Sequence, residues 1–384
     1  MKKIPYGRQV ISQEDIDQVT AVLSSELITQ GPIVPEFEQQ FAAYFNTKYA
    51  VAVSSGTAAL HLACLALGIG EGDVVITSPI TFAASMNCAQ YCGATASFVD
   101  ICPDNFCLSI DALKKRLETD SHSVRAVVVV HFAGYPVDMP SLFSLSKKHN
   151  FFIIEDVCHA PGAARRNNDG VAFRVGNCEY SHISTFSFHP VKHMTTGEGG
   201  MFLTNDSTLY QRALRLRSHG ITKDAEQLHE NHGGWYYEMH DLGFNYRMTD
   251  FQAALGLSQL KRLDWSNERR RQIAERYTQQ LASLPIKIQK MEEGVQHAFH
   301  LYVILTEYRD QLYRYLHERG VLAQVHYVPV NSMPYYKKLG HSPEDTPKAL
   351  NYYQRCISLP MYPTLLDEEI DYVIEALHEF FEAH

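Results

Sequence analysis

The feature that most constrains the fold is a regular alternation of apolar runs and helical segments between residues 49 and 156. The apolar runs are rich in β-branched residues and bounded by turn residues, which is typical of buried strands. They cover residues 49–54, 74–77, 95–99, 126–131 and 151–156. Helical segments lie between them at 57–68, 82–92, 110–117 and 139–149. Strands joined through helices pair in parallel, so the pattern predicts an α/β fold with a mostly parallel central sheet covered on both faces.

The pattern changes after about Arg247. Residues 250–284 have the composition of one long, uncapped helix, and strand candidates at 300–305 and 322–328 then alternate with helices at 310–319 and 367–381. We therefore expect two domains. The large domain comprises residues 1–250, including an N-terminal arm with a helix that begins after Ser12, and the smaller α+β domain comprises residues 251–384, including the linking helix.

Composition excludes several classes of protein. Hydrophobic residues make up 45% and charged residues 20% of the 384 positions, which indicates a globular protein rather than a disordered one. The formal net charge is −9 and no basic run occurs, which argues against a nucleic-acid partner. No long apolar stretch or signal-like segment is present, so we expect a cytoplasmic protein that does not enter a membrane. The eight cysteines have no paired C-x-x-C spacing, and neither a zinc site nor a disulfide framework is expected.

Two candidate sites lie where predicted strands end. Ser55, Gly56 and Thr57 form a turn that enters a helix, and free N–H groups at a helix start can bind a phosphate. Such a turn also forms for backbone reasons alone. In IIEDVCH, Asp156 ends an apolar strand and His159 follows closely. A buried carboxylate requires a partner, and a cationic ligand, a salt bridge or a helix cap would each supply one.

Lys192 is the third candidate, within STFSFHPVKHMTTGEGG. Burial would lower its pKa and give a neutral amine that attacks carbonyl carbons. The alternative is an exposed loop lysine, which would stay charged and have no catalytic role. Phe82 follows a strand end and could stack on a flat ring, or simply pack in the core. A phosphate-binding helix start, a strand-end carboxylate and a shielded lysine are together what pyridoxal 5′-phosphate needs.

These segments also carry a family resemblance. FSFHPVKHMTTGEGGMFLTND, IIEDVCHAPGA, ITSPITFAAS, VHFAGYPVDM, LGFNYRMTDFQAALGLSQLKRLD and VHYVPV resemble the sugar aminotransferases of the DegT/DnrJ/EryC1/StrS family. The resemblance extends from PYGRQVISQEDID to SLPMYPTL, nearly the whole chain. It implies an aspartate aminotransferase-like (type I) fold, pyridoxal 5′-phosphate as cofactor and no metal site.

The resemblance also implies roles for individual residues. Lys192 would bind the aldehyde of the cofactor, Asp156 would pair with its ring nitrogen, and Phe82 would stack on its ring. His159 would lie near the ring hydroxyl, and Gly56, Thr57 and Ser187 would hold the phosphate. Asn245 would reach the phosphate from the neighbouring subunit, which implies a homodimer with shared sites. The residues that would contact the sugar nucleotide are Tyr6, Leu27, Ile28, Thr29, Gln30, His326, Tyr327, Val328, Pro329 and Val330.

Within the family, PYGRQ, LITQGP, CLALGIGEGD, TSPITF, VHFAGYP and FSFHPVK are most similar to the members that serve pseudaminic acid biosynthesis. This similarity implies that L-glutamate supplies an amino group to C4 of UDP-2-acetamido-2,6-dideoxy-β-L-arabino-hex-4-ulose. The chain departs from those members at SSGTAAL, at NSMPYY and in the insert DAEQLHENHGGWYYEMH, so the sugar could be another nucleotide-linked 4-keto sugar.

Residue patterns disfavour four alternatives. A sugar dehydratase of the same family would carry histidine at the lysine position, but the register of FHPVK places Lys192 there, beside His193. A nicotinamide enzyme is disfavoured because the glycine run GIGEGD closes a helix and precedes a strand. A non-catalytic binding protein would not need Lys192, Asp156 and Ser187 together. The histidines His182, His189 and His193 have no metal-binding spacing.

Overall fold

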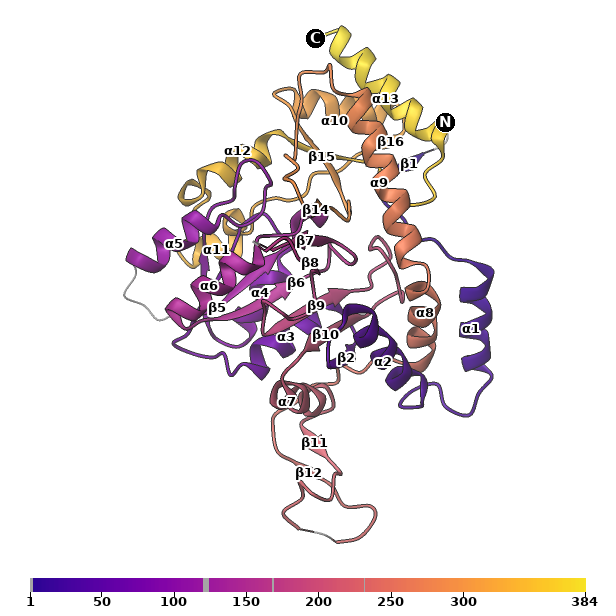
Figure 1. Ribbon diagram of the computed structural model, residues 1–384, viewed down its shortest axis with the longest axis vertical. Coiled ribbons are helices and arrows are strands. Elements are labelled where there is room, and N and C mark those ends of the chain that lie inside the picture. Colours follow the sequence, from indigo (N-terminus) through magenta and orange to yellow (C-terminus); the bar gives the residue numbers. More distant parts are fainter. Residues whose placement is uncertain (1–2, 120–123, 168, 231) are drawn as a thin grey trace.

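A seven-stranded sheet forms the centre of the molecule in the computed structural model, which describes residues 3–119, 124–167, 169–230 and 232–384 (Figure 1). Its strands are β2 (Tyr49–Val53), β3 (Val74–Thr77), β4 (Thr95–Phe98), β5 (Val124–Val130), β6 (Phe152–Asp156), β9 (Ile183–Ser187) and β10 (Gly200–Thr204). The strand order is β2-β10-β9-β6-β5-β3-β4. Strand β10 runs antiparallel to both of its neighbours, and the other neighbouring strands pair in parallel. The predicted α/β class is confirmed.

Helices cover both faces of this sheet (Figure 1). On one face, α3 (Gly56–Ala66), α4 (Ala84–Tyr91) and α7 (Ser207–Arg217) share an apolar core with the strands. The other face is covered by α5 (Ile110–Thr119) and α6 (Met139–His149), and by α2 (Ile33–Phe45) and α8 (Asp250–Leu260). Side chains alternate along a strand, so Ile153 and Ile154 of β6 belong to different cores. The same alternation directs Glu155 and Asp156 to opposite faces.

The C-terminal part has its own apolar core, built from α9 (Leu263–Gln280), α10 (Arg309–Glu318), α13 (Asp367–Glu382) and a small sheet. That sheet pairs β13 (Lys287–Ile288), β15 (Tyr302–Leu305) and β17 (Cys356–Leu359) antiparallel. The N-terminal strand β1 (Ile4–Pro5) pairs with β16 (Val321–Leu322), and Ile4 packs in this C-terminal core. A domain boundary near residue 250 stays a prediction.

Two expectations about secondary structure are wrong. Residues 250–284 are not one helix, because α8 ends at Leu260 and α9 begins at Leu263, and Thr249 caps α8 through a capping box with Gln252. The strand expected at 322–328 stops at Leu322, after which only Gln324 forms an isolated bridge. Pro329 follows, and proline has no N–H with which to continue a strand ladder. The N-terminal helix is confirmed as α1 (Gln13–Leu23), with Ser12 and Asp15 forming its capping box.

The remaining elements outside the hairpin arm are short. They are β7 (Ala164–Arg166), β8 (Ala172–Arg174), β14 (Val295–Gln296), α11 (Pro334–Lys338), α12 (Pro347–Arg355) and the 3-10 turns Phe132–Gly134, Val330–Ser332 and Pro343–Asp345. All eight cysteines are free. Within the described ranges, no helix has both the length and the apolar character needed to cross a membrane.

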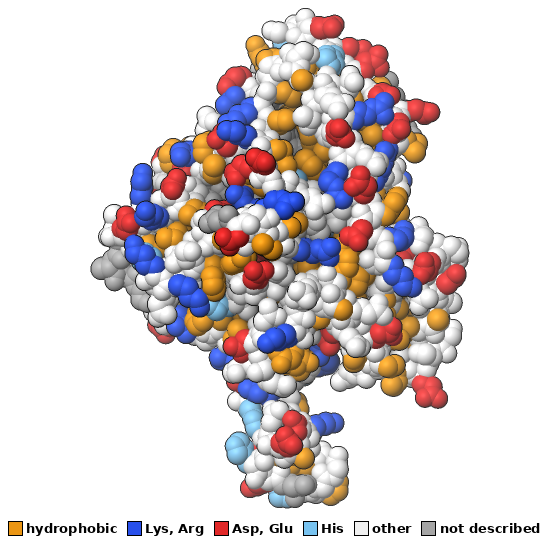
Figure 2. Space-filling view, in the orientation of Figure 1, with side chains coloured by type: hydrophobic (Ala, Val, Ile, Leu, Met, Phe, Trp, Pro, Cys, Tyr) orange, Lys and Arg blue, Asp and Glu red, His pale blue; other side chains and the backbone are white. Residues whose placement is uncertain are grey.

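A hairpin arm projects away from the sheet below α7 (Figure 1). It consists of β11 (Ile221–Thr222), β12 (Glu238–Met239) and the described residues between them, together with His240. Figure 2 shows histidine side chains gathered along one side of this arm. The described residues of the arm include most of segment 224–240, where the family resemblance predicts a variable insert.

Candidate active site

A cavity of about 360 Å³ opens at the carboxyl ends of the parallel strands. This edge of an α/β sheet is where ligands bind in such folds. The predicted site residues that line it are Tyr6, Gly56, Thr57, Phe82, Asp156, His159, Ser187, Lys192, His326 and Tyr327. They come from both ends of the sequence and from four strand-to-loop junctions. The fold therefore gathers the predicted cofactor residues, apart from Asn245, in one place.

Lys192 lies in the loop between β9 and β10, where its backbone N–H donates to the carbonyl of His189 at 2.9 Å. Its side chain is half-buried and lines the cavity. Burial lowers the pKa of this amine below its usual 10.5, and the charge of Arg270 lowers it further, against the opposing influence of Cys158 and Asp156. A lysine of this kind is neutral more often than a surface lysine, and a neutral amine is the nucleophilic form.

Asp156 ends β6 and is only 4% exposed. Its carboxylate accepts hydrogen bonds from the hydroxyl of Ser85 at 2.8 Å and from the backbone N–H of Cys158 at 3.1 Å. The Ser85 hydroxyl is itself 2.7 Å from that of Thr81. Among the described residues, no basic side chain forms an ion pair with Asp156. A buried carboxylate without a cation of its own fits a protonated ring nitrogen such as that of pyridoxal 5′-phosphate.

The start of α3 fits a phosphate. Ser55 caps this helix by accepting from the N–H of Ala58 at 3.0 Å, and the amides of Gly56 and Thr57 precede that bond. First-turn amides point out of a helix toward its N-terminal end and attract anions. Ser187 ends β9 beside them, so close that a Cβ on Gly56 would lie 2.7 Å from the Cβ of Ser187. Glycine is therefore required for the helix start and the serine to share one phosphate site.

We expect Gly56→Ala to weaken binding of pyridoxal 5′-phosphate by about 10-fold. Relieving the clash must separate Ser187 from the helix start, and the one or two hydrogen bonds lost are worth about 1 kcal/mol each. Fluorescence titration of the cofactor-free protein would measure the change. Gly234→Ala is the control, because a Cβ there meets no atom within 4 Å. Equal affinities for the two variants would contradict the phosphate assignment.

His159 is buried beside the cavity in a fixed tautomer. Its Nδ1 accepts from the backbone N–H of Ala133 at 3.3 Å, so the proton of the neutral ring lies on Nε2, which contacts the hydroxyl of Tyr327 at 3.1 Å. Burial, and then the charge of Lys192, hold the pKa of His159 well below its usual value. The ring is therefore neutral and acts as a hydrogen-bond donor.

Phe82 is 60% exposed at the cavity mouth, which leaves its ring face free for stacking.

The predicted sugar-nucleotide residues separate into two groups. Tyr6 and His326 line the cavity with ring centroids 5.0 Å apart, and Tyr327 lies beside them. The others, which lie outside the cavity formed by this chain, are Leu27, Ile28, Thr29, Gln30, Val328, Pro329 and Val330. Val330 packs in the core and donates its N–H to the carbonyl of Pro79, so it offers no side chain to this cavity. Residues 27–30 and Asn245 are exposed.

Sequence reasoning missed several residues that line the cavity. Ser85 and Thr81 were overlooked although both lie in TSPITFAAS, where polar residues four positions apart flank a helix start. His189 and Glu198 also line the cavity beside Lys192 and were not predicted. Ser85 could have been found by searching for a hydroxyl donor, because the buried carboxylate of Asp156 needs a hydrogen-bond partner.

Glu155 belongs to a structural network and not to the cavity. Its buried carboxylate accepts from Nε2 of His131 at 2.9 Å, from Ser181 at 2.7 Å, from Ser184 at 2.9 Å and from the N–H of Gly176 at 2.8 Å. Burial alone would raise the pKa of this carboxyl, but these hydrogen bonds outweigh it and lower the pKa. The two adjacent carboxylates of IIEDVCH thus serve two purposes, one on each face of the sheet.

His193, which follows Lys192 in the sequence, makes a buried contact away from the cavity. Its Nδ1 lies 2.8 Å from Oδ1 of Asn267 in the buried interior, and its ring does not line the cavity. Lys192 alone of the two reaches the site. The histidine that would mark a dehydratase is therefore not at the reactive position.

This geometry on this sheet defines the class, a pyridoxal-phosphate-dependent aminotransferase of type I fold, in which a lysine, a strand-end aspartate and a helix N-terminus surround one cavity. A family model described as the DegT/DnrJ/EryC1/StrS aminotransferase family matches residues 9–378. The chain belongs to this family. Members use pyridoxal 5′-phosphate, and the chain is accordingly a pyridoxal-phosphate-dependent nucleotide-sugar aminotransferase.

Relatives match along nearly the entire chain. The spore coat polysaccharide biosynthesis protein SpsC of Bacillus subtilis is 39% identical, covering 98% of this chain and 96% of its own. GDP-perosamine synthase of Escherichia coli O157:H7 is 35% identical, covering 99% of each. A UDP-4-amino-4,6-dideoxy-N-acetyl-β-L-altrosamine transaminase of Campylobacter jejuni is 36% identical, and the match covers 99% of this chain and 98% of the transaminase.

Solved structures of similar proteins share the fold. Helicobacter pylori PseC, described as an aminotransferase of pseudaminic acid biosynthesis, has a TM-score of 0.90 at 30% identity over 100% of both chains. The pyridoxal-phosphate form of a sugar aminotransferase from Streptococcus pneumoniae, Spr1654, also has a TM-score of 0.90 at 30% identity, over 99% of both chains.

Proposed function

We propose that this enzyme transfers an amino group from L-glutamate to C4 of a UDP-linked 4-keto-6-deoxy-N-acetylhexosamine, as in pseudaminic acid biosynthesis. The observation that carries the chemistry is the placement of Lys192 and Asp156 in one cavity at the strand ends. The Campylobacter transaminase and Helicobacter PseC support the choice of sugar. The identity to GDP-perosamine synthase is almost as high, so identity alone does not separate a UDP-sugar from a GDP-sugar.

The proposed roles of the cofactor residues follow from their surroundings. Asp156 would keep a proton on the ring nitrogen, Gly56, Thr57 and Ser187 would hold the phosphate, and His159 would lie near the ring hydroxyl. Bound there, pyridoxal 5′-phosphate supplies the conjugated ring that takes up negative charge from the reacting carbon.

Lys192 would move the protons. Its neutral amine takes the proton from the α-carbon of glutamate in the first half-reaction, and its ammonium form delivers a proton onto C4 of the sugar in the second. Burial lowers the pKa of Lys192, which favours the neutral form of the amine relative to a surface lysine. Cofactor and sugar bound in the cavity would exclude the bulk water that competes for these protons around the half-buried amine.

The sugar nucleotide would occupy the outer cavity. Phe82, Tyr6 and Tyr327 offer aromatic surface there, and His326 is held neutral because burial, followed by the charge of Lys192, lowers its pKa to about 3. A neutral imidazole and phenol hydroxyls bind a sugar through hydrogen bonds and not through charge.

We further propose that the cavity is completed by a second copy of the chain. Asn245 and residues 27–30 are exposed in the single chain and lie outside its cavity. Exposed apolar side chains lie in the same N-terminal region, among them Ile16, Leu23, Leu27 and Ile28. Exposed apolar side chains mark an interface where they form a patch, and a patch of these four side chains would be covered by the second copy. Asn245 of one subunit would contact the cofactor phosphate of the other.

The substrate assignment is tested with purified enzyme, L-glutamate and a series of nucleotide-linked 4-keto sugars. We expect the UDP-linked β-L-arabino ketone to be aminated with the highest kcat/KM. The matched comparisons are the D-configured UDP ketone, which differs in configuration, and the GDP-linked ketone that precedes perosamine. A preference for either comparison substrate would refute the pseudaminic acid assignment but leave the aminotransferase intact.

A further inference from the structure

The hairpin arm carries three potential metal ligands far from the active-site cavity. Glu238 lies in β12 and His240 follows it two positions later, so both side chains leave the extended segment on the same face. His229 lies in the loop between β11 and β12 and approaches the same face. No sequence motif predicts this group, because His229 lies in a loop and has no regular spacing from Glu238 and His240.

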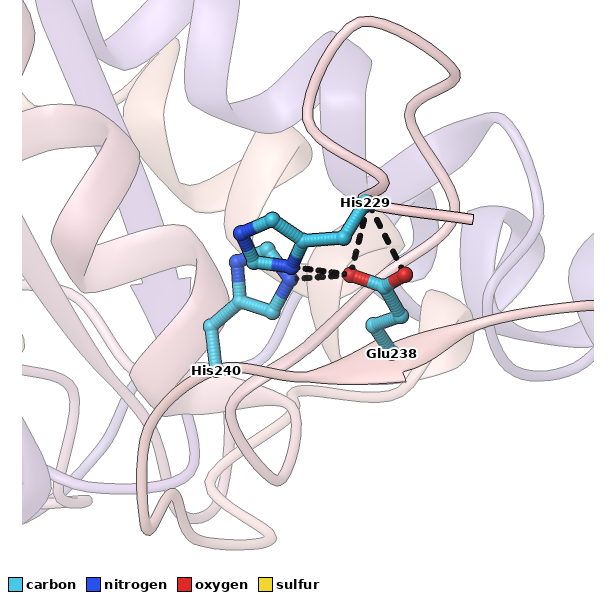
Figure 3. Close-up of side chains that lie close together, drawn as sticks. All are labelled: His229, Glu238 and His240. Atoms are coloured by element: carbon cyan, nitrogen blue, oxygen red, sulfur yellow. Dashed lines mark hydrogen bonds and ion pairs between the residues drawn. The ribbon is translucent and has the colours of Figure 1, made fainter. Parts of the chain in front are cut away.

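The two imidazoles converge on one carboxylate oxygen. Nδ1 of His229 is 2.9 Å and Nε2 of His240 is 2.7 Å from Oε2 of Glu238 (Figure 3). The three potential ligand atoms all lie within 4.8 Å of one another. Ligand atoms around a tetrahedral zinc ion are roughly 3.3 Å apart, given metal–ligand distances near 2.0–2.1 Å. Small rotations of the two rings would open the space for an ion.

The carboxylate is held in position by other groups. The backbone N–H groups of His229 and Glu230 donate to Glu238 at 2.9–3.0 Å, and the hydroxyl of Tyr236 donates at 3.1 Å. The Glu238 side chain is 12% exposed, whereas that of His229 is 83% exposed. Outer hydrogen bonds that orient a ligating carboxylate are a regular feature of metal sites. One fixed ligand and two adjustable imidazoles would adapt readily to an ion.

The surroundings admit an ion from solvent. His229 and His240 face an open hollow of about 560 Å³ between the arm and α7. Two arginines of α7 also line this hollow, but both are engaged, Arg215 with the carboxylate of Asp241 at 3.1 Å and Arg212 with the carbonyl of Ala66 at 3.1 Å. Solvent access would leave a fourth coordination position for water.

We propose that His229, Glu238 and His240 form a zinc-binding site. Two imidazole nitrogens and one carboxylate oxygen match the ligand preference of Zn²⁺, whereas Mg²⁺ and Ca²⁺ require mostly oxygen ligands. The ion would take the place of the hydrogen bonds between the two rings and the carboxylate. It joins the loop to β12 and so stiffens the arm a few residues before Asn245.

The test uses the holoenzyme, freed of any polyhistidine tag, in a buffer without phosphate. We expect isothermal titration with ZnCl₂ to show one saturable ion per chain, and MgCl₂ to show none. The variants His229→Ala and His240→Ala should each weaken Zn²⁺ binding by more than about 10-fold, the loss that even an outer-shell change produces. His232→Ala is the matched control, an exposed arm histidine that pairs with Glu230 instead, and should bind as wild type.

Cobalt gives a second readout. Co²⁺ in place of Zn²⁺ should produce the visible absorption of a tetrahedral site in the wild type and in His232→Ala, but not in Glu238→Gln. The glutamate half-reaction of each variant verifies that the enzyme remains folded. Absence of zinc binding, or binding that persists unchanged in His229→Ala and His240→Ala because cysteines or the active site hold the ion, would overturn the proposal.

Discussion

Replacing Lys192 by alanine is expected to lower kcat for amino transfer by about 10²- to 10⁴-fold, the range that proton transfer by a positioned side chain supplies. The variant also loses the group that binds the cofactor aldehyde, so the visible absorbance that follows addition of pyridoxal 5′-phosphate should change. Formation of 2-oxoglutarate from L-glutamate measures the rate. Lys261→Ala is the control, since that lysine forms a surface ion pair with Glu14 and lies outside the cavity.

The same variant tests the shared site. Subunits carrying Lys192→Ala, mixed and refolded with subunits carrying Asn245→Asp, should regain part of the activity that each lacks alone. A hybrid dimer contains one cavity in which both residues are intact. An unrestored rate would refute the assignment of Asn245 to the neighbouring cavity, and an active Lys192→Ala enzyme would refute the assignment of the lysine.

Asp156→Asn is expected to reduce kcat by about 10²–10³-fold while leaving KM for L-glutamate nearly unchanged. The amide keeps the size of the side chain but removes the negative charge that holds a proton on the ring nitrogen, and losses of this size follow removal of one electrostatic contact at a reacting group. Steady-state kinetics of the glutamate half-reaction separate the two parameters.

Ser85→Ala provides the graded comparison. It removes one hydrogen bond to Asp156 and leaves the carboxylate charge in place, so the effect on kcat should be smaller than that of Asp156→Asn. Equal losses in the two variants, or a loss in KM alone, would argue that Asp156 positions its neighbours and does not act on the cofactor.

The sequence predicted five of the seven strands of the sheet and missed β9 and β10. The strands that were easiest to predict are buried on both faces. Continuous β-branched runs such as VVIT and AVVVV have no alternative to a covered parallel sheet, and each became a strand at nearly the expected position. The segment 322–328, which was predicted to be a strand, has a similar apolar character. Its conformation depends instead on contacts with residues that are distant in the sequence, and His326 and Tyr327 line the cavity. The hydroxyl of Tyr352, for example, donates to the carbonyl of His326. Propensity does not encode such contacts.

Some residues of the candidate site could be predicted from the sequence, and others could not. Asp156 could be predicted because it ends a predicted strand and topology brings strand ends to one edge, whereas Ser187 followed only from the family resemblance, since no strand was predicted before it. The distinction between Asp156 and Glu155 could not, because it depends on which face of β6 each side chain occupies and on donors from distant loops. The arm histidines were not predicted as ligands, since the loop that returns His229 to Glu238 has no periodic signal.

The pairing of β1 with β16 has a consequence for the order of events during synthesis. Ile4 hydrogen-bonds the carbonyl of Gly320, and the carbonyl of Tyr6 accepts from the N–H of Met361. The strands and helices of the large sheet leave the ribosome long before these partners do, and domains can fold as they emerge. The wall of the cavity that Tyr6 forms must wait for the last part of the chain. A nascent chain therefore acquires its cofactor residues early and its substrate wall last.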